Sequence, residues 1–572
     1  MTARAACFVK AGVAVIALAT LAVSARANEK TNGALPFAHD VPQFENVAAA
    51  AGIRHVYDGP WEFFVGGGVA AFDCNGDRRP DLVFAGGTRP AMVYVNRSKT
   101  GGALAFERRP EALPRTARTN VLGAYPIDID SDGIRDLVLL RLGGNAILKG
   151  GADCSFRPAA RTLGIDRGNA WTTAFAAVFE KDAAFPTLAF GNYIDRAAPG
   201  SPWGTCHDNL LVRPSRPSKR DPDHKPYGER QQALLAHCTL SLLFTDWNKS
   251  GAPALRVTND RQYYRGGEEQ LWRMRSGRPA RPFRARDGWR TLRIWGMGIA
   301  EADLDADGFP EYALTSMGDT KLQVLERDDS GDLRPQYRDL AYARRATAHR
   351  PYAGGDLKPS TGWHAEFADF NNDGRSDLFI AKGNVEQMPE FAANDPDNLL
   401  LGMQDGGFHE AGLTAGIARN TRGRGAALVD LNMDGQLDLV VVNRKVPASV
   451  FVNRGAAAPG SDPGQTRATT RPMGNWLQIE LRQDDINRDA IGATLLIKTG
   501  NHTQSRRVFV GGGHASGRLG FVHVGLGTAE RAVVRIRWPD GAWSADYRVF
   551  ANSFVVIPRS AEKAKYWYPP QH

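Results

Sequence analysis

The chain repeats one pattern of hydrophobic and polar positions: a short apolar run, a cluster of acidic residues, and a second short apolar run. The first acidic positions of successive copies lie about 51 to 67 residues apart. Apolar runs such as the one from Asp136 to Arg141 fit strands that are buried on both faces. Five good copies begin at Ala70, Tyr125, Ile299, Glu366 and Ala427; a weaker copy begins at Leu242, and one at Ala176 keeps the apolar runs without the acids.

A repeat of this length has room for four short strands, which make one blade of a β-propeller. A single four-stranded unit leaves both faces apolar, whereas radial stacking lets each blade cover its neighbour. The sequence therefore predicts an all-β, seven-bladed β-propeller over residues 40–455. Seven matching copies argue against the alternative, a set of unrelated β-hairpins. The composition agrees, because 61 Gly and 33 Pro among 572 residues suit many short strands joined by tight turns.

Each good acidic cluster follows the pattern D-x-[DN]-x-D-G-x-x-[DE], in which the first copy departs at one position. Oxygens from side chains 1, 3, 5 and 9 and from carbonyl 7 converge, and Gly at position 6 permits a sharp turn. Carboxylates this close repel one another without a cation. Oxygen ligands favour Ca²⁺, and the absence of His or Cys at these positions disfavours zinc. We predict four or five Ca²⁺ ions, with the ligands Asp73, Asn75, Asp77, Asp81; Asp128, Asp130, Asp132, Asp136; Asp303, Asp305, Asp307, Glu311; Asp369, Asn371, Asp373, Asp377; and Asp430, Asn432, Asp434, Asp438.

The acidic clusters differ in how closely they match this pattern. The first has Arg78 where Gly is expected, so we expect it to bind its cation more weakly. The loop that begins at Asp246 has Ala254 in place of the last acid, so a cation is less expected there. A dry Asx-turn loop would explain any one cluster, but it does not explain five.

These loops and their flanking strands resemble FG-GAP or VCBS repeats, the Ca²⁺-binding blades of integrin α-subunit propellers and of many secreted bacterial proteins. The resemblance covers residues 40–455 and implies the same propeller fold and the same cation.

A second domain follows. Residues 456–473 are rich in Gly, Ala, Pro and Thr, which predicts a linker. Residues 474–560 resemble the ASPIC/UnbV domain, because N-W-L from Asn475, N-R-D-A-I-G-A from Asn487, G-L-G from Gly525 and W-P-D-G from Trp538 occur in order. Together with the blades, this domain resembles the family of cartilage acidic protein and its bacterial relatives. Alternation over residues 532–538 predicts a small β-sandwich. One departure is G-G-G-H-A at residues 511–515, where relatives usually carry an aromatic residue.

The N-terminus has the pattern of a secretion signal over residues 1–27, with Arg4 and Lys10, an apolar run at 11–25, and the small-x-small motif from Ala25 to Ala27. The run is short for a transmembrane helix, which disfavours the alternative of an uncleaved anchor. We expect a secreted or periplasmic monomer with no membrane span after cleavage. Cleavage would lower the formal charge from +9 to +6, and the dispersed excess argues against nucleic acid as a partner.

Four cysteines remain after such a cleavage, and an oxidising compartment permits disulfides. Cys206 and Cys238 flank a Pro- and charge-rich insertion, so we predict that they are joined. The sequence leaves the pairing of Cys74 and Cys154 open.

Three tryptophans stand six to eight residues ahead of the acidic position of their repeats: Trp171, Trp295 and Trp363. The innermost strand of each blade runs into the cation loop, so residues ahead of it should ring the opposite mouth of the channel. We predict a ligand site there that also includes His364 and Arg424. Trp offers a flat apolar surface to a sugar ring or other planar group, and Arg424 could hold a carboxylate or sulfate. The alternative is that the Trp side chains plug the channel.

Two functions of different class fit this sequence. The first is a secreted, calcium-stabilised binding or adhesion protein that recognises a glycan, a matrix component or a protein. The second is an enzyme of the lyase or cyclase type with its active site at the channel mouth. Binding is favoured, because the sequence contains no nucleophile elbow, no HExxH motif and no Cys/His cluster with ligand spacing.

Overall fold

A computed structural model describes residues 40–198, 205–215, 225–228, 231–260, 267–327, 333–347, 361–384, 394–458 and 470–570. The predicted signal at residues 1–27 lies outside these described residues. Strands dominate the fold, and the helical elements of the described chain are α1 (Ala160–Leu163) and two 3₁₀ turns, Trp61–Phe63 and Ala285–Asp287. The predicted all-β class is confirmed.

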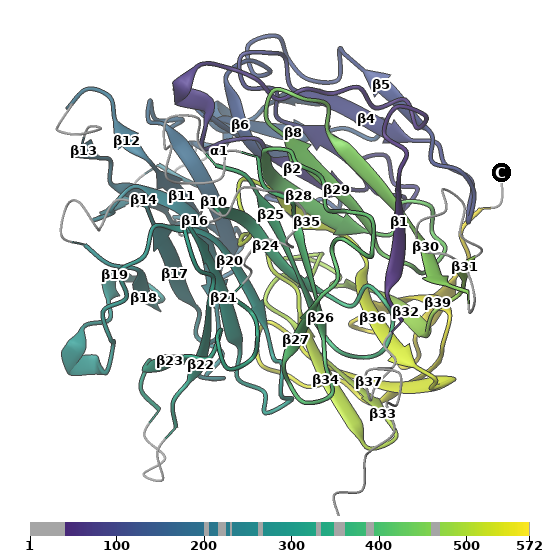
Figure 1. The fold of residues 1–572 in the computed structure, drawn as a ribbon. Coiled ribbons are helices and arrows are strands. Elements are labelled where there is room, and N and C mark those ends of the chain that lie inside the picture. The colour runs from purple at the N-terminus through teal and green to yellow at the C-terminus, as the bar shows by residue number, and fades with distance from the viewer. Residues whose placement is uncertain are drawn as a thin grey trace, which may run out of the picture. The chain divides into compact units, whose positions relative to one another are not determined.

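Among the described residues, seven sheets share a core of four antiparallel strands that follow one another in order, and two of these sheets carry a fifth strand, β31 (Thr470–Arg471) or β35 (Gly517–Leu519) (Figure 1). The first three are β2 (Val69–Phe72), β3 (Asp81–Phe84), β4 (Met92–Asn96), β5 (Phe106–Arg109); β6 (Val121–Ile127), β7 (Asp136–Arg141), β8 (Ala146–Gly150), β9 (Phe156–Pro158); and β10 (Thr172–Val178), β11 (Thr187–Asn192), β14 (Asn209–Val212), β15 (Gln231–Leu234). A short hairpin, β12 (Ile194–Asp195) with β13 (Thr205–Cys206), is inserted in the third.

The remaining four sheets continue the series along the chain. They are β16 (Thr239–Thr245), β17 (Ala254–Asn259), β18 (Gln270–Arg275), β19 (Arg278–Pro282); β20 (Gly296–Ala302), β21 (Glu311–Ser316), β22 (Lys321–Leu325), β23 (Tyr337–Asp339); β24 (Gly362–Ala368), β25 (Asp377–Lys382), β26 (Asn398–Gly402), β27 (Phe408–Glu410); and β28 (Gly423–Val429), β29 (Asp438–Asn443), β30 (Ser449–Ala457), completed by β1 (Pro42–Asn46). The outermost strand of the last sheet thus comes from the N-terminal end of the described chain.

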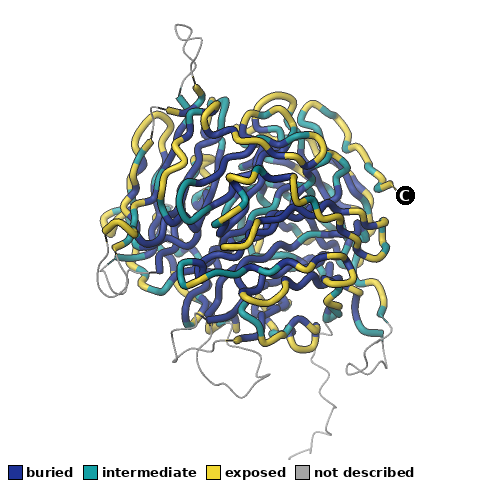
Figure 2. Tube along the Cα trace, turned by 90° about the horizontal axis from the view of Figure 1, so that it is seen from above, coloured by how far each residue is buried: buried dark blue, intermediate teal, exposed yellow. Residues whose placement is uncertain are grey.

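The first strand of each sheet contacts the first strand of the next, in the order β2, β6, β10, β16, β20, β24, β28 and back to β2. These inner strands are largely buried, and the interior of the molecule in Figure 2 is mostly dark blue. Their sequences are not uniformly apolar, because they include Glu301, His364 and Arg424. Each inner strand runs toward its acidic loop, so all these loops lie at one end of the channel and the strand starts lie at the other. The predicted β-propeller is confirmed.

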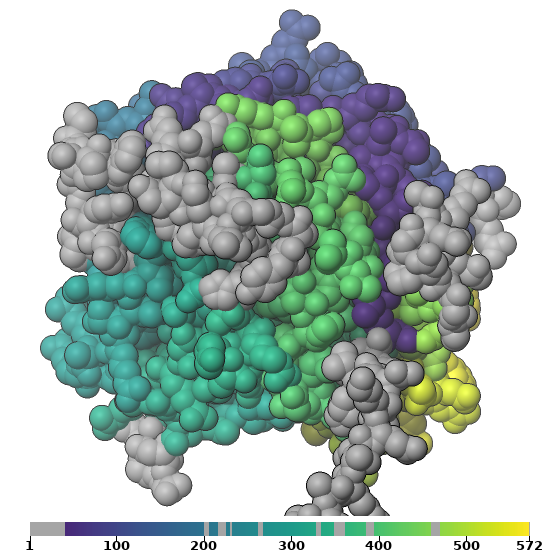
Figure 3. All heavy atoms as spheres, in the orientation of Figure 1, coloured from purple at the N-terminus to yellow at the C-terminus, as the bar shows by residue number. Residues whose placement is uncertain are grey.

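The C-terminal domain consists of two four-stranded sheets that share one buried apolar cluster. One sheet has the order β36 (Val522–Gly527), β32 (Asn475–Arg482), β39 (Ser553–Pro558), β40 (Lys565–Trp567), and the other β34 (His502–Arg507), β33 (Thr494–Thr499), β37 (Arg531–Arg537), β38 (Tyr547–Phe550). On the face seen in Figure 3, C-terminal residues, coloured yellow, are visible at the lower right.

The predicted linker at 456–473 has paired strand residues at both ends. The strand β30 continues to Ala457, and β31 (Thr470–Arg471) pairs with its end, so that Ala456 lies opposite Arg471. Residues 459–469 lie outside the described part of the chain.

Two disulfides are present. One joins Cys206 to Cys238, as the sequence predicts. The other joins Cys74, in the first acidic loop, to Cys154, which follows β8. The second bridge ties the first propeller sheet to the next.

Candidate metal centres and the filled channel

The five acidic loops share one hydrogen-bonded geometry. In each loop the first acid accepts a bond from the backbone N–H of position 6, at 2.8–3.1 Å. The ninth-position acid is buried and accepts a bond from the N–H of position 2, at 2.7–3.1 Å. The backbone therefore holds the outer two carboxylates of every loop in place.

Position 6 requires a left-handed backbone. Gly133, Gly308, Gly374 and Gly435 have φ of 83–90° there. Arg78 takes the same conformation, with φ 64°, at a cost of roughly 1–2 kcal/mol for a residue with a Cβ. The first loop thus keeps the geometry of the others while carrying backbone strain.

Burial removes water from around these carboxylates and makes their charged form less favourable. It raises the pKa of Asp81 and of Glu311 to about 8, and neighbouring carboxylates push in the same direction. Burial likewise raises the pKa of Asp369 to about 7 and that of Asp438 well above its usual value. Groups of this kind favour either a proton or a metal ion.

The residues present fit a hard cation. Three carboxylate oxygens lie within 4.8 Å of one another in the loop of Asp303, Asp305 and Glu311. The same spacing occurs in the loop of Asp128, Asp130 and Asp136, but there the Lys149 ammonium lies against the carboxylates. Oδ1 of Asp303 and Oδ1 of Asn432 are buried without a hydrogen-bond donor. An all-oxygen donor set with orphaned acceptors suits Ca²⁺ better than zinc.

The C-terminal domain packs directly on these loops. Its contacts reach all five of them and the loop at Asp246: Glu480 with Arg78 (2.9 Å), the Asn487 N–H with Ser131 Oγ (2.9 Å), Arg537 with Asp246 (3.1 Å), Ser505 Oγ with Asp303 (3.0 Å), His523 Nε2 with Asn372 Oδ1 (2.7 Å), and Gln478 Nε2 with Asp430 (3.3 Å). The candidate metal centres therefore lie at the interface between the propeller and the C-terminal domain.

A buried ion-pair network strengthens this interface. Arg135, which belongs to the second loop, lies 2.9 Å from Asp489 and 3.3 Å from Glu480 of the C-terminal domain. Both carboxylates and the guanidinium are 6% exposed or less, so the pair is largely desolvated. Nearby, Arg507 pairs with Glu301 and Arg518 with Glu366 beside an interface cavity of about 610 Å³.

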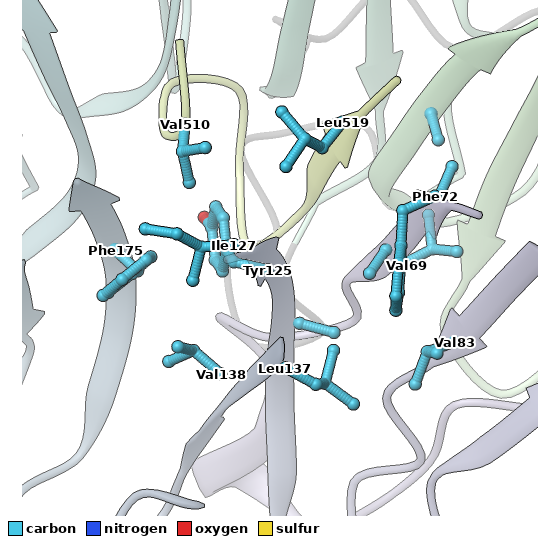
Figure 4. Packing of buried hydrophobic residues seen from close by; sticks show 14 of the residues in the cluster. Val69, Phe72, Val83, Tyr125, Ile127, Leu137, Val138, Phe175, Val510 and Leu519 are labelled. Atoms are coloured by element: carbon cyan, nitrogen blue, oxygen red, sulfur yellow. The ribbon is translucent and has the colours of Figure 1, made fainter. Parts of the chain in front are cut away.

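The propeller channel is filled by residues 509–519, which we call the channel segment. It arises between β34 and β36 of the C-terminal domain, and its strand β35 (Gly517–Leu519) pairs in parallel with β2. Figure 4 shows Val510 and Leu519 among the buried side chains of the inner strands. Further bonds join it to five more inner strands: Ala124 N to Ala515 O (3.0 Å), Ala177 N to Val510 O (3.0 Å), Gly512 N to Leu242 O (2.7 Å), Gly513 N to Ile299 O (2.7 Å), and His514 N to His364 Nδ1 (3.1 Å).

Close approach of the two backbones explains glycines on both sides. A Cβ on Gly68 would lie 1.8 Å from Ala515 O, and one on Gly425 would lie 2.2 Å from Ser516 Oγ. A Cβ on Gly513 would lie 2.3 Å from the His364 ring. The G-G-G-H-A sequence that departs from the family pattern is therefore the tip of the channel segment, a role that sequence reasoning did not find.

The structure places the five predicted ligand residues at the end of the channel opposite the acidic loops, as expected. Trp363 and Arg424 meet, with the guanidinium 4.3 Å from the ring centroid, and Trp363 lies 5.0 Å from the ring of His514. Trp171 packs instead against Trp61, Phe64 and Tyr193.

Most of these side chains are buried. Trp171, Trp363, His364 and Arg424 are 0–3% exposed, whereas Trp295 is half-buried. The Arg424 guanidinium donates to the carbonyls of Phe64, Gly383, Gly423 and Asn384. Their burial favours a packing role above the channel segment, and ligand binding by them stays a prediction.

No helix that the structure describes is long and apolar enough to cross a membrane.

Comparison with known proteins agrees with the architecture. The family model described as FG-GAP-like repeat matches residues 73–139 and 369–441, and the one described as ASPIC and UnbV matches residues 483–564. Cartilage acidic protein 1 of Mus musculus is 25% identical over 250 residues, which cover 43% of this chain and 34% of the mouse protein. The Homo sapiens protein is 24% identical over 250 residues, 43% of this chain and 33% of the human protein. The match thus spans about a third of these relatives.

Solved structures show weaker likeness. Saccharomyces cerevisiae Sqt1 has a TM-score of 0.35 and 11% identity, covering 73% of this chain and 100% of that chain. An Agrocybe aegerita lectin has a TM-score of 0.33 and 15% identity, covering 65% of this chain and 88% of that chain. The chain therefore consists of FG-GAP-like repeats followed by an ASPIC and UnbV domain, and its weak similarity to cartilage acidic protein 1 supports this family assignment.

Proposed function

We propose that this protein is a secreted, calcium-stabilised binding or adhesion protein whose propeller recognises a glycan, a matrix component or another protein. The observation that carries the proposal is the set of preorganised acidic loops at Asp73, Asp303, Asp369 and Asp430, which lie at the domain interface. Their donor oxygens suit Ca²⁺, and the C-terminal domain packs against them. Two disulfides fit an oxidising compartment.

Calcium has a structural task in this proposal. Without it, buried carboxylates in each loop repel one another, and the loops contact both domains. An ion that binds only the folded state stabilises it by about 2.7 kcal/mol per site at a hundredfold excess over its dissociation constant. Removal of calcium should therefore loosen the loops and the interface together.

The channel segment limits where a ligand can bind. It enters from the end of the channel that bears the acidic loops and fills the channel up to His514, beneath Trp363. The ligand face of the propeller is then the opposite end, where Trp61 and Trp295 keep part of their surface exposed. The buried Trp363 and Arg424 lie between that face and the channel segment.

One observation favours the alternative that this protein is an enzyme. His514 is fully buried beside Trp363, and burial together with the Arg424 charge lowers its pKa to about 3. A neutral imidazole at this depth could act as a base only if the Trp363 ring moved aside. Binding is therefore the function we propose, with a lyase or cyclase activity as the alternative.

Two measurements test the proposal. Melting of the calcium-saturated chain should occur at a higher temperature than melting in EDTA, and metal analysis should find bound Ca²⁺. A glycan array, together with matrix proteins, should then show binding that EDTA or Trp295→Ala abolishes. Fewer than two Ca²⁺ per chain would refute the calcium assignment, and turnover of a polysaccharide would support the enzyme instead.

A further inference from the structure

In the second acidic loop one ammonium contacts several carboxylates, whereas the cations on two other loops, Arg327 at Asp307 (2.6 Å) and Arg375 at Asp373 (3.0 Å), each contact one loop carboxylate. The Lys149 ammonium lies 2.5 Å from Asp130 Oδ1, 2.7 Å from Asp132 Oδ2 and 3.4 Å from Asp136 Oδ1. An ammonium group has three N–H donors, which here face three carboxylates of one loop. The Lys149 side chain is 12% exposed, so its charge lies inside the loop rather than in solvent.

The register of the sheets explains how Lys149 reaches the loop. On the neighbouring strand, Leu148 lies opposite Leu137, so Lys149 on β8 lies opposite Asp136, the ninth-position acid. The corresponding residues in the other four loops are apolar, as the pairings of their strands show: Val95, Val324, Leu401 and Val452. The lysine is therefore specific to the second loop.

A metal ion and this ammonium cannot share the loop as it stands. Ca²⁺ requires oxygen ligands at 2.3–2.6 Å, and the ammonium already occupies the side that Asp130, Asp132 and Asp136 share. Entry of Ca²⁺ would force a second positive charge against the first or expel Lys149 from three ion pairs. The residues of this loop therefore do not fit the ion that its sequence pattern predicts.

We propose that the Lys149 ammonium is the resident cation of the 128–136 loop, which binds no Ca²⁺ in the wild-type chain. The lysine supplies permanently the charge compensation that the other loops obtain from an ion. The loop at Asp246, which lacks its last acid, shows a related arrangement, because Arg537 of the C-terminal domain lies 3.1 Å from the Asp246 carboxylate. Calcium is then expected in the loops that begin at Asp73, Asp303, Asp369 and Asp430.

This inference rests on the proposed function for the assignment of Ca²⁺ to the other loops. Metal content of the calcium-saturated, desalted chain tests it with a matched pair of variants. Asp130→Asn and Asp305→Asn change the same position, the third, in two loops. Asp305→Asn should lose one Ca²⁺ per chain, whereas Asp130→Asn should lose none. Loss of one ion from Asp130→Asn would overturn the inference.

The converse variant is Lys149→Met, which removes the charge and keeps the length of the side chain. It should gain one Ca²⁺ per chain, while Val324→Met, at the same position of another loop, should leave the count unchanged. An unchanged count in Lys149→Met while other loops bind would contradict the proposal.

A calcium-free measurement separates this proposal from the calcium assignment itself. In EDTA, Lys149→Met should melt below the wild type, because three carboxylates lose their counter-ion, and Val324→Met should not. If the chain bound no Ca²⁺ in any loop, the proposed function would fail, yet this difference in EDTA would still identify Lys149 as the resident cation. Equal melting of Lys149→Met and wild type in EDTA would refute that role.

Discussion

Trp363→Ala should destabilise the protein severely, because its indole is a fully buried contact between the inner strand β24 and the channel segment. Truncation of a buried Trp costs about 3–5 kcal/mol through lost burial and the cavity left behind. The variant also removes the ring face that lies 4.3 Å from the Arg424 guanidinium, which contributes about 1–2 kcal/mol more in a desolvated setting. The bond from Nε1 to the Gly383 carbonyl, at 2.5 Å, is lost as well.

The assay is denaturant unfolding followed by far-ultraviolet circular dichroism at saturating Ca²⁺. Trp363→Ala should lower the free energy of unfolding by about 4–7 kcal/mol. Trp295→Ala is the matched control, because its side chain is only partly buried and the cost should be about 1–2 kcal/mol. An unchanged unfolding midpoint for Trp363→Ala would refute the packing role and return Trp363 to the exposed ligand site that the sequence suggests.

Three further changes test other parts of the structure. Cys206→Ser should lower stability by about 3–4 kcal/mol in the chain-entropy model, and unreduced peptide mass spectrometry of the wild type should show Cys206 joined to Cys238. Arg135→Met should cost about 1.5–3 kcal/mol and speed proteolytic release of the C-terminal domain, because Glu480 and Asp489 each lose one buried ion pair while keeping the one to Arg482. The pKa of His514 is about 3 in the folded state and about 6.5 in the unfolded state. The neutral imidazole therefore contributes fully to folding stability above pH 6.5, and this stability is lost as the pH falls toward 3. Between pH 7.5 and pH 5.5, His514→Phe should lose about 1.4 kcal/mol less free energy of unfolding than the wild type.

Local patterns made the propeller and its acidic loops predictable. Each loop needs its own spacing of acids and a residue that tolerates positive φ, and both are visible within nine positions; Arg78 marks the one exception. The disulfide between Cys206 and Cys238 was predictable because the two residues flank one insertion. Cys74 and Cys154 are 80 residues apart on different sheets, and nothing local joins them.

The missed features all depend on contacts between distant parts of the chain. Lys149 is one lysine in a strand, and its proximity to Asp130 follows only from the register of β7 and β8. The channel segment bonds to strands as much as 447 residues away, as in the bond from the Val69 N–H to Ser516 Oγ. The three consecutive glycines before His514 were the available signal, and they indicated a close approach without naming its partner.

The channel segment is synthesised after the propeller sheets, although it fills the centre of the propeller. The sheets of the propeller are complete once residue 457 has been synthesised, but the segment that fills their axis ends at residue 519, about 60 residues later. At 5–20 residues per second, translation leaves the ring without its centre for roughly 3–12 seconds. During that time the backbone N–H groups of Ala124 and Ala177 lack the carbonyls that they later bind. A segment made after the propeller sheets thus becomes the middle of the protein, and a nascent chain that stalls between residues 457 and 509 would keep an unfilled channel.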